Sequence, residues 1–163
     1  MFTKIEVCFE VEGNMMEAKF MKEAIRLAVE NVLKFGGKPF GAVLVKDGEI
    51  IARAVNEVER EFDPTAHAEL LTIKDACKQL KTLDLSDCVL YASGQPCPMC
   101  LSAIYWANIK EVYFAYSLSD AGKVGLSSEY IYNQISAEHK EISFRQFHVD
   151  SENPLNIWYE KQI

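Results

Sequence analysis

Two short segments of the chain carry side chains whose types and spacing suit metal chemistry. The first is His67-Ala68-Glu69, and the second runs from Cys97 to Cys100 and follows Pro96 at a predicted helix start. Two cysteines three residues apart share one face of a helix, and the positive end of the helix dipole favours their thiolates. With His67 they form a one-nitrogen, two-sulfur set that suits zinc and leaves the fourth tetrahedral position open. The open position predicts a catalytic zinc ion that activates a water molecule.

Glu69 is the candidate proton carrier of this site. Residues two apart do not share a face of a helix, so His67 and Glu69 can serve one metal only if the metal lies off the helix end. The sequence therefore predicts that two helix N-termini converge on one zinc ion. Glu69 would then reach the activated water without ligating the metal.

Two other interpretations of the cysteine pair remain open from the residues alone. A Cys-x-x-Cys in a reducing compartment is often a redox pair or half of a structural zinc site. The redox interpretation leaves His67 and Glu69 without a role. The structural interpretation needs a fourth ligand, for which Cys77 and Cys88 are the candidates, although both lie in apolar stretches typical of core thiols.

The elements that must position these residues alternate between strand and helix. Asp47-Gly48 between two β-prone runs is a strong hairpin signal, and Gly36-Gly37 ends the first predicted helix. The alternation predicts a layered α/β sandwich. The predicted strands are residues 2–11, 41–45, 49–55, 88–92, 111–116 and 141–149, the predicted helices 14–35, 67–78, 96–106, 127–135 and a short one from 154, and the predicted loops 56–66 and 117–126.

Composition bounds the class of protein. The 163 residues suit one domain, and the net charge of −7 argues against a general nucleic-acid binder. An odd count of five cysteines, with acidic residues where a secretory signal would be apolar, predicts a reducing compartment, the cytoplasm. The uncharged run 88–109 has the length of a membrane span, but Gly94 and Pro96 interrupt it. A buried strand, a turn and a helix explain this run better.

Together the two segments match the H-x-E…P-C-x-x-C signature of the zinc-dependent nucleobase deaminases. Residues 38–43, 63–69 and 103–107 also resemble bacterial guanine deaminases of the cytidine deaminase superfamily, and the resemblance spans roughly residues 14–158. It implies a cytidine deaminase-like α/β fold, a three-layer α/β/α sandwich with a five-stranded mixed sheet. It also implies a single catalytic domain over 14–163 that follows an N-terminal extension, 1–13.

The same resemblance implies roles for individual residues. His67, Cys97 and Cys100 would hold zinc, and Glu69 and Asp120 would be the catalytic residues. Residues expected to contact the substrate are Phe40, Asn56, Ala68 and Trp106. Without the resemblance, Asp120 reads as a turn residue and Asn56 as a strand-end cap.

The activity that the resemblance implies is hydrolysis of guanine to xanthine and ammonia by a homodimer, with possible exchange of C-terminal segments. Gln95 departs from the glutamate that the family usually has, and Tyr159 is the candidate for a capping residue in the tail. Other bases or nucleosides (guanosine, cytosine, an aminotriazine) remain alternatives, as does a non-catalytic zinc-stabilised binding module. A tRNA adenosine deaminase shares the signature, but residues 127–163 hold three Lys or Arg against six Asp or Glu, which disfavours a phosphate backbone.

Overall fold

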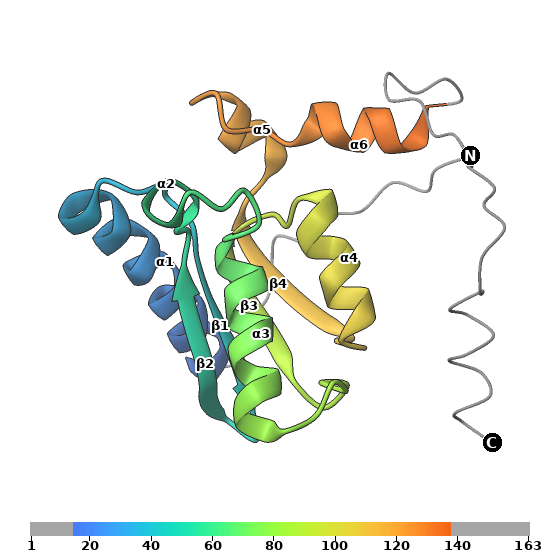
Figure 1. Ribbon diagram of the computed structural model, residues 1–163. Coiled ribbons are helices and arrows are strands. Elements are labelled where there is room, and N and C mark those ends of the chain that lie inside the picture. Colours follow the sequence, from blue (N-terminus) through green and yellow to red (C-terminus); the bar gives the residue numbers. More distant parts are fainter. Residues whose placement is uncertain (1–14, 138–163) are drawn as a thin grey trace, which may run out of the picture.

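The structure is a computed structural model and describes residues 15–137. Helices and strands alternate through most of this part of the chain (Figure 1). The elements are α1 (Met15–Phe35), β1 (Gly41–Lys46), β2 (Glu49–Val55), α2 (Val58–Glu61), α3 (Ala68–Leu80), β3 (Val89–Gly94), α4 (Pro98–Trp106), β4 (Glu111–Tyr116), α5 (Leu118–Gly122) and α6 (Glu129–Ser136).

The described strands form one mixed sheet in the order β2-β1-β3-β4. β1 pairs antiparallel with β2 and with β3, whereas β3 pairs parallel with β4. The predicted hairpin turn is present, and Asp47 and Gly48 both have positive φ, 51° and 76°. Two positive φ values in a two-residue loop match the twist of the flanking strands, which explains why Asp-Gly is favoured there.

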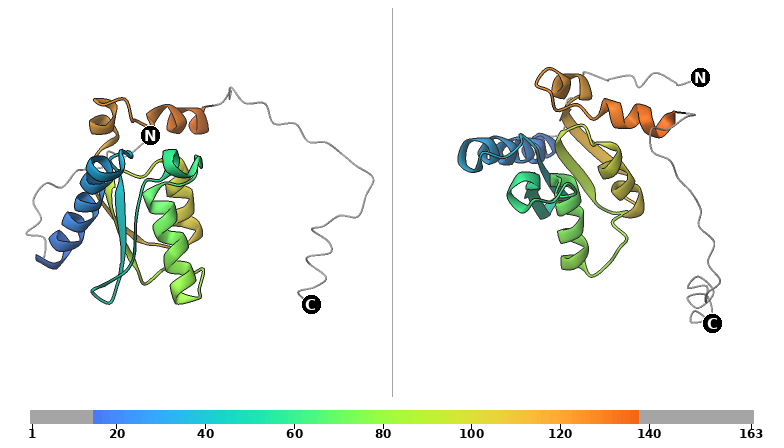
Figure 2. Two further views of the ribbon diagram at one scale, coloured as in Figure 1. Left: turned by 60° about the vertical axis from the view of Figure 1, so that its left-hand side comes forward. Right: turned by 45° about the horizontal axis from the view of Figure 1, so that its top comes forward.

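Helices cover both faces of the sheet and make three layers (Figures 1 and 2). Alternate residues of β1 point to opposite faces. Val43 and Val45 belong to the core cluster on the α1 side. Ala42 and Leu44 belong to the larger cluster on the side of α3 and α4. This two-sided burial explains why β1 is apolar at every position from 42 to 45.

The predicted five-stranded sheet has four strands among the described residues. The predicted fifth strand, 141–149, lies outside the described residues, as do the predicted strand 2–11 and the helix from 154. The predicted loop 117–126 contains a short helix, α5, because Ser117 and Asp120 form a capping box. No helix within residues 15–137 is both long and apolar enough to span a membrane.

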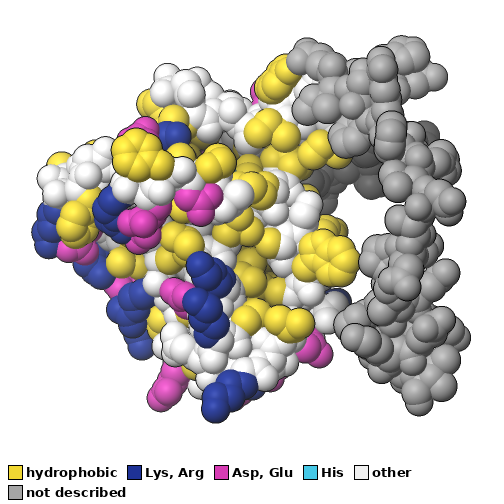
Figure 3. All heavy atoms as spheres, viewed as in Figure 1, with side chains coloured by type: hydrophobic (Ala, Val, Ile, Leu, Met, Phe, Trp, Pro, Cys, Tyr) yellow, Lys and Arg dark blue, Asp and Glu magenta, His cyan; other side chains and the backbone are white. Residues whose placement is uncertain are grey.

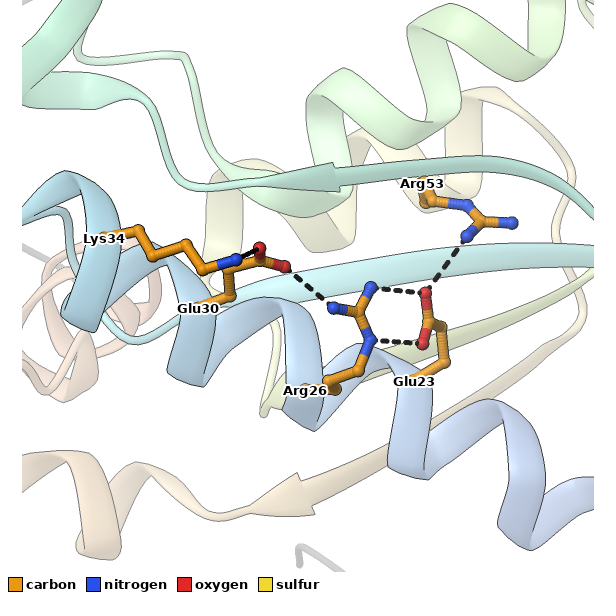
Figure 4. A network of polar contacts seen from close by, with 5 residues as sticks. All are labelled: Glu23, Arg26, Glu30, Lys34 and Arg53. Carbon is orange, nitrogen blue, oxygen red and sulfur yellow. Dashed lines mark hydrogen bonds and ion pairs between the residues drawn. The ribbon is translucent and has the colours of Figure 1, made fainter.

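An ion-pair network on α1 reaches the edge strand β2 of the sheet (Figure 4). Arg26 contacts Glu23 and Glu30 on α1, and Glu30 also pairs with Lys34. Glu23 reaches beyond the helix and accepts a 3.1 Å hydrogen bond from Arg53 of β2. The pairs are largely exposed and each contributes little, so the buried apolar stripe of α1 carries most of its docking energy.

The carboxyl ends of β2, β3 and β4 meet at one edge of the sheet, because β2 and β3 both run opposite to β1 and β4 runs parallel to β3. The segments that leave this edge lead into α3, α4 and α5. In Figure 1, α5 and α6 lie across this same edge. Side chains far apart in the sequence therefore converge here, as is usual for sites in α/β proteins.

Candidate active site

The predicted metal ligands form one cluster at this edge. The Nδ1 atom of His67 lies 3.5 Å from Sγ of Cys97 and 3.5 Å from Sγ of Cys100, and the two sulfurs lie 3.5 Å apart. Among the described residues, these three form the group whose ligand atoms can hold one ion. One imidazole and two thiols at these separations fit the tetrahedral coordination of zinc with three protein ligands.

Two helix N-termini build the cluster, as the sequence predicts. His67 is the N-cap residue of α3, and Cys97 is the N-cap residue of α4. Sγ of Cys97 also accepts a hydrogen bond from the backbone N–H of Cys100. Pro98 occupies the first turn of α4, where its missing N–H has no cost. The positive ends of both helices therefore face the thiolates.

The cluster favours one thiolate even without metal. The hydrogen bond with Cys100, together with the nearby His67 ring, lowers the pKa of Cys97 well below the ordinary thiol value. The pKa of Cys100 is raised, first by its hydrogen bond with Cys97 and then by burial. The hydrogen bond with Cys97 raises the pKa of His67. Cys97 and Cys100 would both be thiolates when they hold a zinc ion, because a coordinating thiol is deprotonated.

Glu69 lies in the first turn of α3 and lines the same cavity as His67 and Cys97. Its side chain is only 7% exposed, and it is not one of the three clustered ligands. Burial raises the pKa of its carboxyl above the ordinary value. A buried carboxyl group with a raised pKa, beside a metal cluster and outside its ligand set, suits reversible proton transfer near neutral pH.

The cavity has a volume of about 460 Å³, and its walls are mostly apolar. Phe40 and Asn56, both predicted to contact the substrate, line it. The Phe40 ring packs over Gly94 so closely that a Cβ at Gly94 would lie 2.9 Å from the ring. Glycine at the end of β3 therefore leaves room for the Phe40 ring at this wall of the cavity.

Asn56 is held in one orientation at the end of β2. Its Oδ1 accepts a 3.3 Å hydrogen bond from the backbone N–H of Val58, and its own backbone N–H donates to the carbonyl of Phe40 at 3.0 Å. The side-chain oxygen is thereby occupied. The amide nitrogen is the part of Asn56 that can donate a hydrogen bond to a ligand in the cavity.

Asp120 lines the cavity and also caps α5. Its Oδ2 accepts hydrogen bonds from the backbone N–H and the hydroxyl of Ser117, and its Oδ1 pairs with Lys123 at 2.8 Å. The hydrogen bonds from Lys123 and then Ser117 lower the pKa of Asp120 to about 2. The residue is therefore an ionised helix cap at the cavity wall.

Two predicted substrate residues do not line the cavity of the described chain. Trp106 ends α4 and is 87% exposed. The N-terminal end of α4 faces the metal cluster, and nine residues at 1.5 Å each place Trp106 about 13 Å along the helix axis from Cys97. Its prediction as a pocket wall is not supported within this chain.

Ala68 is fully buried at the first position of α3, where only its backbone N–H is available to a ligand.

Two walls of the cavity were not predicted from the sequence, apart from Asp120 in the second of them. One is an apolar stripe on α1 that includes Val29, Val32 and Leu33. The other is the segment 117–128, here called the α5 roof. The sequence does indicate the stripe on α1, because its residues are apolar yet lie outside the helix positions that pack into the core, Phe20, Ala24 and Leu27. A second apolar face on a helix indicates that the helix packs against or lines a further feature, which here is the cavity.

Residues 15–116 match the family model of the cytidine and deoxycytidylate deaminase zinc-binding region. This match covers more than half of the chain, and it includes every residue of the metal cluster and Glu69. The chain therefore belongs to the zinc-dependent deaminases of this family. His67, Cys97 and Cys100 are the residues that could hold its zinc ion, and three protein ligands would leave the fourth tetrahedral position to water.

Several relatives are similar over different lengths. The chain is 46% identical over 147 residues to the guanine deaminase of Bacillus subtilis, covering 88% of this chain and 94% of that protein. The crystal structure of that guanine deaminase matches with a TM-score of 0.82. A tRNA-specific adenosine deaminase of Aquifex aeolicus is 47% identical over 96 residues, which cover 59% of this chain and 63% of that protein. A structure of guanine deaminase from Nitrosomonas europaea is 29% identical, covers 67% of this chain and 63% of that one, and has a TM-score of 0.63.

Proposed function

We propose that the chain is a zinc-dependent aminohydrolase that converts guanine and water to xanthine and ammonia. The observation that carries this proposal is the convergence of His67, Cys97 and Cys100 beside the buried Glu69 in one cavity. Guanine is the proposed substrate because the guanine deaminase of Bacillus subtilis matches almost end to end. The tRNA-specific adenosine deaminases match either over less of both chains, as the 47% identical one does, or over most of both chains at a lower identity of 29% or 32%.

Zinc supplies a Lewis acid that lowers the pKa of a coordinated water to near 7. Glu69 accepts a proton at a carboxylate oxygen from the attacking water. Glu69 passes this proton to the ring nitrogen next to the reacting carbon. It then takes the second proton from the hydroxyl that has added to that carbon and delivers it to the departing amine, which leaves as ammonia while the carbonyl forms. Burial favours the protonated form of Glu69, so the carboxyl group holds the proton between these two transfers.

The remaining cavity residues would bind and orient the base. Phe40 offers a ring face against which a planar purine can stack. The Asn56 amide nitrogen can donate to an oxygen or ring nitrogen of the base, and the Ala68 backbone N–H is a second donor at the start of α3. Asp120 is proposed to contact the base from the roof, although its oxygens already bind Ser117 and Lys123. We assign Trp106 no role in the cavity of its own chain.

We also propose a cytoplasmic homodimer in which residues 14–163 form one catalytic domain. The zinc ligands Cys97 and Cys100 must stay reduced, which a cytoplasmic location provides. A face that includes α4 carries gathered hydrophobic side chains (Figure 3). Tyr105 and Trp106 on α4 are 74% and 87% exposed, which suits burial against a second copy. Exchange of C-terminal segments concerns residues outside the described part of the chain and stays a prediction.

The direct test is ammonia release from a panel of purified guanine, guanosine, cytosine, adenine and an aminotriazine, with zinc measured on the same sample. Guanine should be the best substrate at about one zinc per chain. Efficient ammonia release from cytosine or guanosine alone would change the proposed substrate but leave the proposed hydrolytic chemistry unchanged. Deamination of a tRNA anticodon stem-loop, with steep salt dependence, would favour the tRNA class instead. A zinc-loaded protein that acts on none of these would support a binding module.

A further inference from the structure

A buried amide on α1 lies behind the cavity wall and reaches two of the segments that form it. The side-chain nitrogen of Asn31 donates a 2.8 Å hydrogen bond to the carbonyl of Lys38 and a 2.9 Å hydrogen bond to the carbonyl of Asn56. Asn31 is 1% exposed and does not line the active-site cavity. Both of its N–H groups therefore hold backbone that leads into cavity residues.

The amide of Asn31 has a single possible orientation. Both partners of its nitrogen are carbonyl oxygens, so exchanging its nitrogen and oxygen would place acceptor against acceptor. Its Oδ1 has no hydrogen-bond partner among the described residues. A buried unpaired acceptor is unfavourable, and an apolar side chain would avoid that cost. The two hydrogen bonds that the side-chain nitrogen donates therefore explain why position 31 holds an asparagine.

The neighbouring chain makes room for this amide. A Cβ built on Gly37 would lie 2.5 Å from the Asn31 nitrogen, which real side chains do not tolerate. The N–H of Gly37 also donates a 3.0 Å hydrogen bond to the carbonyl of Asn31. Glycine at 37 and asparagine at 31 are therefore fitted to each other, and either can be changed to disturb the other.

The bonds of Asn31 complete a cage around Asn56. The N–H of Asn56 donates to the carbonyl of Phe40, its side-chain oxygen accepts from Val58, and its carbonyl accepts from Asn31. The segment continues through Glu57, whose N–H donates to the carbonyl of Ala66, the residue before the metal ligand His67. Loss of the Asn31 bond would free the carbonyl side of this cage and let the Asn56 amide turn.

We propose that Asn31 is a positioning residue that fixes the direction in which the Asn56 amide nitrogen points into the cavity. This inference rests on the proposed role of Asn56 in binding the base. Asn31 touches neither the cavity nor the metal cluster, so its loss should weaken substrate binding and leave the chemical step nearly intact. The expected result for Asn31→Ala is a KM for guanine raised about tenfold, with kcat changed less than about threefold.

The kinetic experiment uses the full chain loaded with zinc. Asn31→Ala and Asn31→Leu remove both donors, and Gly37→Ala displaces the amide from the opposite side. All three should raise KM. The decisive comparison is Asn56→Ala with and without Asn31→Ala, because Asn31 should add no further rise once the Asn56 side chain is gone. Leu85→Ala is the matched stability control, since Leu85 is fully buried and does not line the cavity. It should lower the melting temperature without raising KM.

Amide hydrogen exchange tests the cage without any substrate. In Asn31→Ala the amides of Asn56 and Val58 should exchange faster, while that of Leu44 in the centre of the sheet should not. Failure of the wild type to deaminate guanine would count against the proposed function alone. The exchange pattern would still show whether Asn31 holds the segment around Asn56. The inference is overturned by a uniform rise in exchange, by a KM rise that persists in the Asn56→Ala background, or by an equal KM rise in Leu85→Ala.

Discussion

The hydroxyl of Tyr132 donates a 2.7 Å hydrogen bond to the carbonyl oxygen of Pro96. Pro96 directly precedes Cys97, so this bond ties α6 to the loop that presents the first sulfur of the metal cluster. Tyr132→Phe removes the hydroxyl and keeps the ring. We expect zinc to leave several times faster, because a net hydrogen bond contributes about 1 kcal/mol, a factor of about five. Zinc transfer to a chromogenic chelator, followed in time, measures this rate.

The control for Tyr132→Phe is Tyr105→Phe on α4, because Tyr105 is 74% exposed and does not line the cavity. Zinc transfer from this variant should match the wild type. If zinc left both variants equally faster than the wild type, the hydrogen bond to Pro96 would not be what holds the loop that carries Cys97.

Glu69→Gln separates proton transfer from metal binding. The amide keeps the shape of the side chain but cannot shuttle a proton, so kcat should fall by about a hundredfold to ten-thousandfold while zinc content stays near one per chain. His67→Ala should lose both zinc and turnover. Ammonia release and metal analysis on the same samples distinguish the two. A Glu69→Gln enzyme with full activity would remove Glu69 from the mechanism.

Removal of zinc should abolish activity without unfolding the chain. The two core clusters on either side of the sheet do not include the metal, so far-ultraviolet circular dichroism should be preserved after chelation. The melting temperature should fall, since a metal present at a hundred times its Kd stabilises the folded state by about 2.7 kcal/mol. Loss of the folded signal on chelation would instead indicate a structural zinc.

Gln95 connects the α5 roof to the loop between β3 and α4, which presents Cys97 to the metal cluster. Its Oε1 accepts a 3.2 Å hydrogen bond from the backbone N–H of Leu118, the first residue of α5. Gln95→Ala removes this acceptor and should raise KM about fivefold and speed amide exchange at Leu118. Gln95→Glu keeps an acceptor at the same place and serves as the control for exchange. Equal exchange at Leu118 in all three proteins would contradict the connection.

Asp120→Asn tests whether the roof carboxylate acts on the substrate. At pH 7–8 the wild-type carboxyl is ionised, since Lys123 and Ser117 hold its pKa at about 2. Asparagine retains an acceptor oxygen for the cap but loses the charge. We expect guanine turnover to fall more than about tenfold with an unchanged melting temperature. Ser117→Ala removes the side-chain half of the capping box and reports how much of the effect comes from α5 itself.

Local chemistry made the metal site predictable from the sequence. His67, Cys97 and Cys100 were recognisable because ligand type and helix-start spacing are local properties, and the hairpin at Asp47-Gly48 was recognisable because its turn demands positive φ. The resemblance predicted Trp106 as a pocket wall, whereas in the described chain α4 runs away from the metal cluster and places Trp106 outside the cavity lining. Helix direction depends on packing between distant elements.

Two other features could not be read from the sequence for related reasons. The order β2-β1-β3-β4 depends on which strands pair across long separations. Asn31 stands between a charged and an apolar residue on an amphipathic helix, so nothing local distinguishes a buried amide from a surface one. The capping box of α5 did leave a signal in Ser117 and Asp120, but Gly122 and Gly125 made the segment look like a loop.

The division of the zinc ligands between α3 and α4 also bears on biosynthesis. His67 and Cys97 are 30 residues apart, so at a translation rate of about 5–20 residues per second the histidine precedes the first cysteine by about 2–6 s. Both helices must dock on the sheet before the three ligand atoms come within reach of one ion. We therefore expect the complete three-ligand site to take up zinc only after both helices have docked. The rate of metal incorporation into a refolding chain would report the moment at which these two helices reach their final places.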